Sequence, residues 1–385
     1  MGEVMIVRRL ERLDADGRQV WGRLSAGYGF YQSELWHQWQ QHDNPGRTWY
    51  LLTEDDRGDP LGGAVVFEWL GDAVPSMNLA YSPGHMVEDV TGRPLTPEQH
   101  RAWLPCLLVG SRAGYDGGFV MRQDLGAEVC RQVMACIAAE VECLRRDVGA
   151  AAWAVEYCPT DQAAMFLTAS RDLGLPVVSG DQSAAAVLDP WAPVRSKHSR
   201  EWDRERRIFE ATGGNVNVSR LSEMVDDIAP LLGRTQAIHQ TGDTTEVLHR
   251  YLLGQAEVLN DCSVVLSSRG RVGVEAFVLG FVGDGVLALR TAGMAADAPR
   301  FSYFALVMTA SRELARDLGL TQVHLGAGSY ATKAARGAVP RWNCSIIRPP
   351  DGVPAEWREA LSTPSWDHRD ASKVWTYPGS DRRAR

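Results

Sequence analysis

The segment HLGAGSYATKAARGA, residues 324–338, brings two glycines, a lysine and an arginine close together in the sequence. Gly326 and Gly328 follow an apolar stretch, and they would let the backbone turn tightly beside a ligand. Ser329 is placed to cap the helix that we expect next. Lys333 and Arg336 would then lie one turn apart on that helix. The spacing matches neither a Walker phosphate loop nor a dinucleotide-binding loop, so an NTPase or Rossmann function is not favoured.

A basic segment, residues 195–207, contains six Lys or Arg residues against three Asp or Glu residues. Arg200, Arg204 and Arg207 fall on one face of a predicted helix, and Lys197 precedes them. Such a face suits the phosphates of a tRNA or of a nucleotide. The interleaved acidic residues allow a second interpretation, a solvated helix whose charges pair with one another.

Acid–base candidates lie within strands or beside them. Glu275 in VGVEAFVLG and Glu156 in WAVEYC are carboxylates in apolar strands, where burial requires a partner or a raised pKa. His324 ends the strand before the glycines, and Tyr303 begins a helix that we expect to face it. Tyr330 lies just beyond the glycines. A carboxylate in a buried strand favours a functional site, whereas His324 or Tyr303, taken alone, is more often structural.

The elements that would position these residues occur twice along the chain. Residues 47–69 and 261–281 each read as two strands joined by a polar or tight turn. Residues 128–149 and 301–319 each read as a long amphipathic helix that ends in glycine and leads into a strand. Repetition on this scale indicates a duplicated α/β domain and not a solenoid, whose repeats are much shorter.

Length and composition agree with two globular domains. The chain has 385 residues, of which 45% are hydrophobic and 23% charged. We expect domains over residues 1–190 and 191–350, with residues 351–385 as a C-terminal arm. The net charge of −8 argues against a general nucleic-acid coat protein and still allows a local basic patch.

The cysteine pattern and the apolar runs bear on the compartment. Seven cysteines occur without any C-x-x-C spacing, which favours packed thiols in a reducing environment over a disulfide framework or a zinc site. No signal peptide or membrane-spanning run is recognisable. We therefore expect a cytoplasmic protein without a metal site. The sequence gives no oligomeric state.

Three segments, taken in order, resemble a known family. They are SKHSREWDRERRIFEATGG before the second half, the hairpin SRGRVGVEAFVLG, and the closing VHLGAGSYATKAARGA. Together they resemble the tandem-GNAT acyltransferases of FemAB-like or BioF2-like type, which are relatives of the Fem peptidyltransferases. The resemblance covers roughly residues 20–350. It implies an α+β fold of two GNAT-like domains, each with a mixed, mostly antiparallel sheet flanked by helices.

The resemblance also implies a chemistry. Relatives transfer an acyl or aminoacyl group to an amine, from acyl-CoA or from aminoacyl-tRNA, with no tightly bound cofactor. The matching lysine, Lys333, would lie at the transfer centre. The segment NLAYSPGHMVED, with Tyr81 and His85, would help to recognise the acceptor. Arg290 and Gly293 in RTAGMA match the pyrophosphate motif of acyl-CoA-binding GNAT enzymes, but ADAPRF follows where those enzymes begin a helix, which favours coincidence.

We therefore predict an N-acyltransferase in which an amine attacks the donor carbonyl directly. Lys333 would stabilise the oxyanion, Arg336 would hold a phosphate or carboxylate, and Glu275 or a water would take the proton. The predicted donor contacts are Arg290, Gly293, Gly326, Gly328, Ser329, Arg336, Lys197, Arg200, Arg204 and Arg207. The predicted acceptor contacts are Tyr81, His85, Glu156, His324 and Tyr330.

Aminoacyl-tRNA is favoured as the donor, because the CoA motif is badly placed and the basic helix is well placed. The acceptor would be an amine of a small metabolite or of a cell-wall precursor. An acyl-CoA-dependent N-acetyltransferase and a non-catalytic GNAT-like binding protein remain as alternatives. Convergence of the predicted catalytic residues Lys333, Glu275 and Tyr303 on one open pocket would separate an enzyme from a binding protein.

Overall fold

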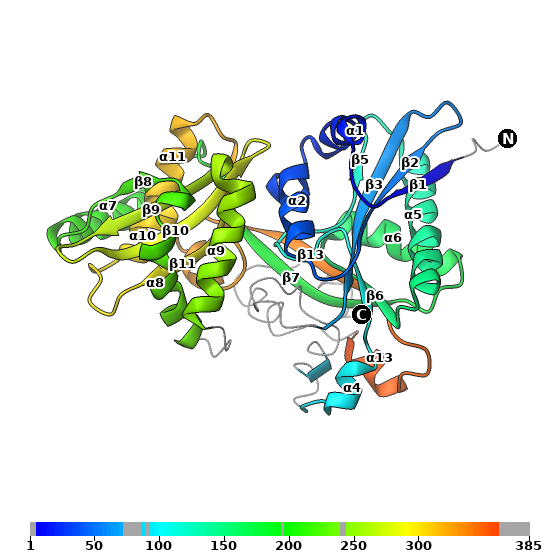
Figure 1. The fold of residues 1–385 in the computed structure, drawn as a ribbon. Helices are drawn as coiled ribbons and strands as arrows, with labels where there is room; N and C mark the ends of the chain where they lie inside the picture. The colour runs from blue at the N-terminus through cyan, green and yellow to red at the C-terminus, as the bar shows by residue number, and fades with distance from the viewer. Residues whose placement is uncertain (1–4, 72–86, 89–92, 194–195, 239–243, 362–385) are drawn as a thin grey trace, which may run out of the picture.

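The structure is a computed structural model that describes residues 5–71, 87–88, 93–193, 196–238 and 244–361 (Figure 1). For residues 180–183 and 196–198 only the backbone is described. The predicted contacts Tyr81 and His85 therefore lie outside the described residues, as does the side chain of Lys197. Within the described ranges, no helix is both long enough and apolar enough to cross a bilayer.

Local signals begin and end the helices of the first half. Asp14 and Ser33 cap α1 and α2 by accepting hydrogen bonds from the backbone N–H groups of Gly17 and Trp36. Gly149, with φ +70°, ends α5 in the left-handed conformation. The elements of this half are β1 (Ile6–Leu10), α1 (Ala15–Ser25), η1 (Phe30–Gln32), α2 (Glu34–His42), β2 (Thr48–Glu54), β3 (Pro60–Trp69), α4 (Pro97–Arg101), β4 (Cys106–Val109), β5 (Val120–Met121), α5 (Ala127–Val148), β6 (Ala152–Pro159), α6 (Thr160–Asp172) and β7 (Val178–Leu188).

The second half repeats this order with different lengths. The predicted long helix over 301–319 is present as three consecutive segments, α10, the π-helical turn η5 and α11. The elements are α7 (Ser196–Ala211), β8 (Asn217–Ser219), η3 (Leu221–Glu223), α8 (Val225–Ile238), α9 (Thr245–Leu259), η4 (Asn260–Cys262), β9 (Ser263–Arg269), β10 (Val274–Gly283), β11 (Val286–Met294), α10 (Ser302–Phe304), η5 (Ala305–Ala310), α11 (Ser311–Asp317), β12 (Gln322–His324), α12 (Tyr330–Ala334), β13 (Val339–Arg348) and α13 (Ala355–Leu361).

All described strands belong to one continuous sheet. Its order is β1-β2-β3-β4-β6-β13-β7-β12-β11-β10-β9-β8, with β5 paired to β3 off this path. The pairs β4–β6 and β11–β12 are parallel, and the other described pairs are antiparallel. The predicted mixed, mostly antiparallel architecture with flanking helices is therefore confirmed.

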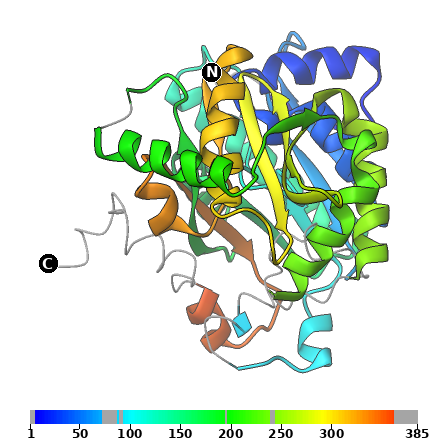
Figure 2. The same cartoon turned by 90° about the vertical axis from the view of Figure 1, so that its left-hand side faces the viewer.

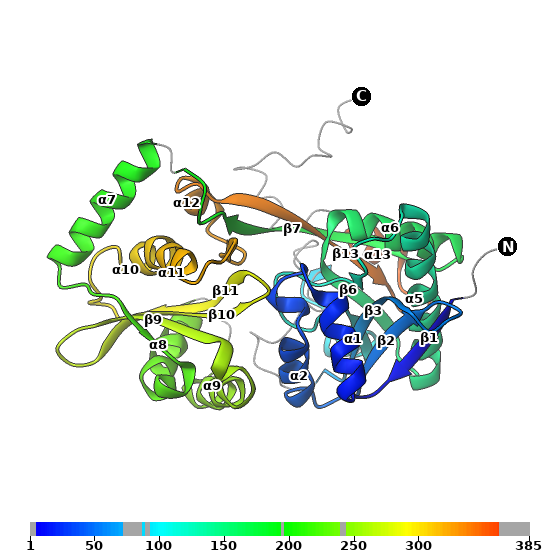
Figure 3. The ribbon, with the colours of Figure 1, turned by 90° about the horizontal axis from the view of Figure 1, so that it is seen from above.

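The two halves exchange their last strands. β7, from the first half, pairs with β12 of the second half, and β13, from the second half, pairs with β6 of the first half. β7 and β13 also pair with each other, from Val339↔Val187 to Ile347↔Val178. Figure 3 shows these two strands running side by side between the halves. The exchange makes the two sheets one hydrogen-bonded unit.

An apolar core at the junction of the halves fixes their relative position. Phe30 of η1 stacks on Phe281 of β10 with ring centroids 5.2 Å apart. Trp39 of α2 meets Tyr251 of α9 edge-on at 5.6 Å. Figures 1 and 3 both show α2 and α9 side by side. Side chains from both halves can therefore build one site with fixed geometry.

Helix α7 packs on the outer side of the second half. Its buried Trp202 and Phe209 face the protein, whereas Arg200, Arg204 and Arg207 are exposed. Figure 2 shows α7 as the green helix that crosses beside the orange α11. The predicted basic helix exists, and its arginine face is directed away from the core.

Candidate functional site

The glycine turn, residues 325–329, connects β12 to α12. Gly326 and Gly328 adopt φ values of +70° and +72°. A Cβ atom on Gly326 would lie 3.1 Å from Cε2 of Tyr115, so this position requires glycine both for its backbone angle and for its space. Ser329 makes no side-chain cap, because its φ of +50° departs from the extended backbone that a capping serine uses. The predicted cap is therefore wrong.

Lys333 supports this turn from α12. Its side chain is 2% exposed, and Nζ donates to the carbonyl oxygens of Leu325 (2.8 Å), Gly326 (3.3 Å) and Ala327 (2.9 Å). The turn is thereby tied to the helix that follows it. A donor oxyanion would have to compete with these carbonyls for the same ammonium protons.

A buried polar network lies beside the turn and joins three segments of the chain. Asp116 comes from the loop between β4 and β5, His324 from the end of β12, and Arg341 from β13. Nη1 of Arg341 donates to Oδ2 of Asp116 at 3.1 Å, and Nε2 of His324 lies 3.4 Å from the same oxygen. Among the described residues, Oδ1 of Asp116 has no hydrogen-bond partner. We call these three residues the junction network.

Burial sets the protonation states of the junction network. It raises the pKa of Asp116 to about 6, although the Arg341 guanidinium acts in the opposite direction. Burial, together with the positive charges of Arg341 and Lys333, lowers the pKa of His324 to about 3. Nδ1 of His324 accepts the Gly326 N–H at 3.2 Å, so the neutral ring carries its proton on Nε2, toward Asp116. Near neutral pH the network therefore holds an ionised carboxylate beside a neutral imidazole.

Aromatic rings and a second arginine surround the network. Tyr31 meets the His324 ring edge-on at 5.5 Å, and Tyr115 stacks on it at 6.1 Å. Arg290 is the extra residue of a β-bulge in β11, and its guanidinium lies 5.5 Å from the Tyr115 ring centroid. Burial alone would lower the pKa of Arg290, but the hydroxyls of Tyr251, Tyr115 and Tyr31 raise it, so the cation persists.

Arg336 has a partner within the protein. Its Nε and Nη2 donate to the carboxylate of Glu205 in α7, and Nη1 donates to the carbonyl of Thr332 at 2.9 Å. The guanidinium also lies 3.8 Å above the Phe304 ring. All three guanidinium nitrogens are thus used inside the fold, and the carboxylate that Arg336 holds is Glu205. The pair joins α12 to α7.

Tyr303 and Tyr330 have different surroundings. Burial and the neighbouring Tyr115 raise the pKa of Tyr303, whose ring meets that of Phe304 edge-on at 5.3 Å. The Tyr330 hydroxyl donates to the backbone carbonyl of Ala184 in β7 at 2.8 Å. Tyr303 therefore packs against the phenylalanine that Arg336 covers, whereas Tyr330 attaches α12 to the exchanged strand.

The RTAGMA segment is strand and not a phosphate loop. Arg290–Met294 belong to β11, and Gly293 is required because a Cβ there would lie 2.6 Å from Phe277 and 2.8 Å from the carbonyl oxygen of Leu231. In the loop that follows, the Arg300 N–H donates to the Thr212 hydroxyl and the Ser302 N–H donates to the Pro299 carbonyl. The geometry gives no helix N-terminus at the motif, as the sequence indicated.

Glu275 does not join the network. It lies at the start of β10, where its carbonyl accepts from the N–H of Ala295 and its carboxylate lies over Gly270. His324 pairs with Ala288 of β11. Ala288 lies seven residues before Ala295, which is roughly 20 Å along the strand direction. The predicted convergence of Glu275 with Lys333 is therefore not present.

Two further predictions are located by the structure. Glu156 is 2% exposed in β6, where its charge adds to burial in raising the pKa of the Cys106 thiol. On α7, Arg204 pairs with Glu201 at 2.9 Å, and Arg207 donates to its own helix through the carbonyl of Asp203. Some of the α7 charge is thus paired along the helix, as the second interpretation of that segment expects.

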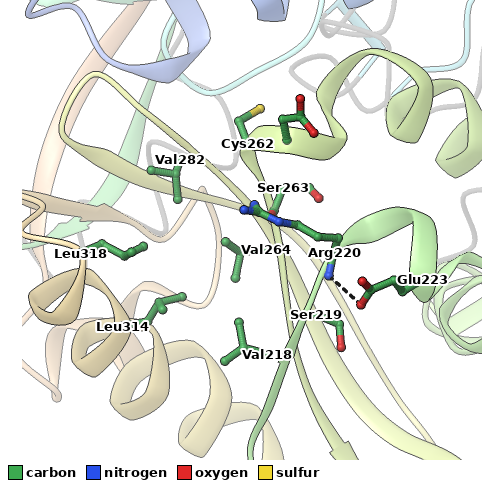
Figure 4. A pocket seen from close by; sticks show the side chains of 11 residues that line it. Val218, Ser219, Arg220, Glu223, Cys262, Ser263, Val264, Val282, Leu314 and Leu318 are labelled. Carbon is green, nitrogen blue, oxygen red and sulfur yellow. Dashed lines mark hydrogen bonds between the residues drawn. The ribbon is translucent and has the colours of Figure 1, made fainter.

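A pocket opens at the far edge of the second half (Figure 4). Its volume is about 440 Å³. Arg220 lies between the apolar side chains there, and its Nη1 donates to the carbonyl of Ser263 at 2.8 Å. The lining residues are Val218, Ser219, Arg220, Glu223, Asp261, Cys262, Ser263, Val264, Val282, Leu314 and Leu318. None of them belongs to the junction network.

Sequence reasoning does not single out Asp116 or Arg341. Asp116 lies in the glycine-rich loop GSRAGYDGG, in which Gly110, Gly114 and Gly118 have positive φ. Such a loop after a buried strand is the signal that could have identified the carboxylate. Its meeting with His324 depends on the strand exchange, which local patterns do not reveal. Among the described residues no group of three or more metal-ligating side chains gathers.

Solved structures share this architecture. FemX matches with a TM-score of 0.59 and 8% identity, over 89% of this chain and 97% of FemX. L-PGS from Bacillus licheniformis matches with a TM-score of 0.52 and 11% identity, over 92% of this chain and 98% of L-PGS. A C-terminal DUF2156 domain assigned to a lysylphosphatidylglycerol synthetase of Agrobacterium fabrum matches with a TM-score of 0.51 and 12% identity, over 90% and 95%.

No family model and no curated protein sequence matches this chain. The similarity to the solved structures extends over both halves and includes nearly the whole of each matched chain. The chain therefore shares the fold of FemX, of L-PGS and of the DUF2156 domain, and this agrees with the two-domain α/β fold that the sequence resemblance predicted.

Proposed function

We propose that this protein is a GNAT-type N-acyltransferase that moves an aminoacyl group from aminoacyl-tRNA to an amine. The acceptor would be a small metabolite or a cell-wall precursor, and the reaction would take place in the cytoplasm. The observation that carries the proposal is the junction network, in which a buried carboxylate with a raised pKa and one unpartnered oxygen lies beside the glycine turn. An amine nucleophile needs such a base near its reaction centre.

The chemistry follows from the protonation states. The amine nitrogen bonds to the ester carbonyl carbon, and the ester bond to the tRNA ribose oxygen then breaks. The proton lost by the amine passes to Oδ1 of Asp116, and Asp116 then gives this proton to the departing ribose oxygen, which leaves as a hydroxyl. Arg341 donates a hydrogen bond to the other oxygen of Asp116 and keeps the carboxylate oriented, and His324 Nε2 lies 3.4 Å from the same oxygen. The buried cation of Arg290 is placed to offset negative charge on the carbonyl oxygen.

Two observations support tRNA over CoA as the donor. The motif that would bind a CoA pyrophosphate is part of β11, and the nearby N–H groups of Arg300 and Ser302 are already bonded. The exposed arginines of α7 offer a surface for a polyanion, and Arg336 joins that helix to α12 next to the glycine turn.

One observation favours acyl-CoA as a second candidate donor. β11 and β12 pair over Val286–Ala288 and Gln322–His324, where β12 ends, whereas β11 continues to Met294. The edge of β11 beyond Ala288 is thus not paired to β12 and lies beside the junction network. An extended ligand with amide groups, such as the pantetheine arm of CoA, could bond to that edge.

The test supplies both donors to the full chain. Purified protein is incubated with tRNA charged with one labelled amino acid at a time, and separately with labelled acetyl-CoA, in the presence of pooled amines. Products are identified by mass. We expect a labelled amide from charged tRNA, and we expect Asp116→Asn to reduce its rate by about 10²-fold or more. Asp56→Asn, which alters an exposed carboxylate far from the network, is the matched control.

Product from acetyl-CoA alone would replace the tRNA proposal with the second candidate. An amide that forms at the wild-type rate in Asp116→Asn would remove the junction network from the mechanism. Absence of product from either donor would favour a non-catalytic binding protein.

A further inference from the structure

Arg341 is the member of the junction network that reaches the surface. Its side chain is 32% exposed, whereas those of Asp116 and His324 are 6% and 1% exposed. It lies in β13 opposite Ala185 of β7, and its guanidinium reaches the loop that carries Asp116. A ligand that approaches from solvent would therefore meet Arg341 before the buried pair.

Only one of the guanidinium nitrogens of Arg341 is used by the protein. Nη1 donates to Asp116, and among the described residues no group accepts a hydrogen bond from Nε or Nη2. Nε and Nη2 form one edge of the planar guanidinium. Two parallel N–H groups on one edge match the two oxygens of a carboxylate.

The contact with Asp116 also prepares this edge for binding. An arginine that is held at Nη1 has already lost part of its side-chain freedom, so a second partner costs less entropy. Asn343, two residues further along β13, donates to the carbonyl of Tyr115 at 2.8 Å and holds the same loop in place. Arg341 and Asn343 therefore fix one rigid surface between β13 and the Asp116 loop.

The local charge favours an anion. Asp116 is balanced by Arg341, and the side chains of Arg290 and Lys333 add two further positive charges around the network. Glu205 does not offset them, because it is paired with Arg336. A neutral or cationic ligand would leave this charge uncompensated, whereas one carboxylate would reduce it.

We propose that the acceptor is an amine that carries a carboxylate, such as an amino acid or a peptide, and that the Nε–Nη2 edge of Arg341 binds this carboxylate. The binding would orient the amine toward Asp116. This inference rests on the proposed function, because it names the acceptor class of the same site. A single planar edge suits a carboxylate better than a phosphate dianion, which needs more donors.

The experiment measures binding and not transfer, so that it can fail independently of the proposed function. Isothermal titration of the full chain uses matched sets of an amino acid, its carboxamide and the amine that lacks the carboxyl group. The sets include the common amino acids and dipeptides. At least one carboxylate member should bind about tenfold tighter than its carboxamide and its amine.

Two variants locate the effect. Arg341→Lys keeps the charge but lacks the planar edge, and Arg341→Gln removes the charge, so both should abolish the preference for the carboxylate member. Arg8→Lys, at a half-exposed arginine on β1, should keep the preference. Thermal unfolding of each variant confirms that it is folded before titration.

Three results would overturn the inference. The first is equal binding of all members of every set, or no binding by any of them. The second is a preference for the carboxylate that survives in both Arg341 variants, and the third is tighter binding of phosphate-bearing amines such as O-phosphoethanolamine. Carboxylate-dependent binding without any transfer product would instead contradict the proposed function and leave the acceptor-site inference supported.

Discussion

The imidazole of His37 in α2 is completely buried, and neither ring nitrogen has a hydrogen-bond partner among the described residues. It meets the Trp21 ring edge-on with centroids 5.5 Å apart. Burial lowers its pKa from the ordinary value of 6.5 to about 3. In the unfolded chain the ring would titrate normally, so His37 makes the free energy of unfolding depend on pH.

The sign and size of this dependence can be worked out. A histidine with a lowered pKa in the folded state contributes stability above its unfolded pKa, and this contribution is lost as the pH falls. Each pH unit below 6.5 costs about 1.4 kcal/mol until the folded pKa is reached. Between pH 8 and pH 5, His37 should therefore lower the free energy of unfolding by about 2 kcal/mol.

The assay compares His37→Leu with the wild-type chain by urea unfolding at pH 8 and at pH 5. Any packing cost of leucine occurs at both pH values and cancels in the difference. His324 titrates in the same direction, and it also cancels because it is present in both chains. The free energy of unfolding should fall by about 2 kcal/mol more in the wild-type chain than in the variant between pH 8 and pH 5. His42→Leu, at an exposed histidine of the same helix, should behave as wild type.

The reasoning would be refuted if the losses of unfolding free energy between pH 8 and pH 5 differed by less than about 0.5 kcal/mol between wild type and His37→Leu. Such a result would mean that unfolding does not expose an imidazole that binds a proton. The same conclusion would follow if His42→Leu changed the pH dependence as much as His37→Leu.

Three other perturbations have expected outcomes. Gly326→Ala adds a Cβ atom against the Tyr115 ring at a residue with positive φ. It should lower the unfolding temperature more than Gly319→Ala, which adds a Cβ atom at a similar φ in open space. Equal losses of unfolding temperature would contradict this packing account. Arg336→Met leaves Glu205 as an unpaired buried charge and should cost about 3–5 kcal/mol in denaturant unfolding. The double variant Arg336→Met with Glu205→Met should recover most of this loss, and a failure to recover would argue against the buried pair as the cause. The transfer rate should rise with pH through about 6, as Asp116 ionises, and this limb should be missing from the residual rate of Asp116→Asn.

Local periodicity was sufficient to predict most of the secondary structure. The hairpin from Thr48 to Trp69 and the helix from Ala127 to Val148 both follow from short-range patterns of apolar and turn residues. The order of these patterns then indicated the duplicated fold. Local patterns did not predict the strand exchange. The residue composition of β7 and that of β13 suit them equally well to pair with β6.

The candidate site was predicted only in part. His324 and the glycine turn were identified from their place after an apolar strand. The placement of Lys333 was not predictable, because it depends on three backbone carbonyls that converge only when the turn folds. Glu275 was predicted as a site residue because the alternation of side chains along a strand shows which face of the sheet a residue lies on. The alternation does not show at which end of the strand the site lies. Periodicity does not single out Asp116, because it lies in a loop, and only the glycine-rich composition of that loop marks it.

The exchange of β7 and β13 has a consequence for synthesis of the chain. The edge of the first half at β6 is completed by residues Val339–Arg348, which leave the ribosome long after β6 itself. At about 5–20 residues per second this interval is roughly ten to forty seconds. During that time β6 has no exchanged partner on its open edge, and such an edge can pair with other chains.

A nascent first half would therefore benefit from a temporary cover, such as its own β7 in the place that β13 later takes. Completion of the fold would then require a replacement of strands and not a simple docking of two finished domains. Loss of β13 by truncation would open the edge of β6 and leave β7 paired only with β12. A C-terminal deletion that begins at Val339 should therefore impair both halves.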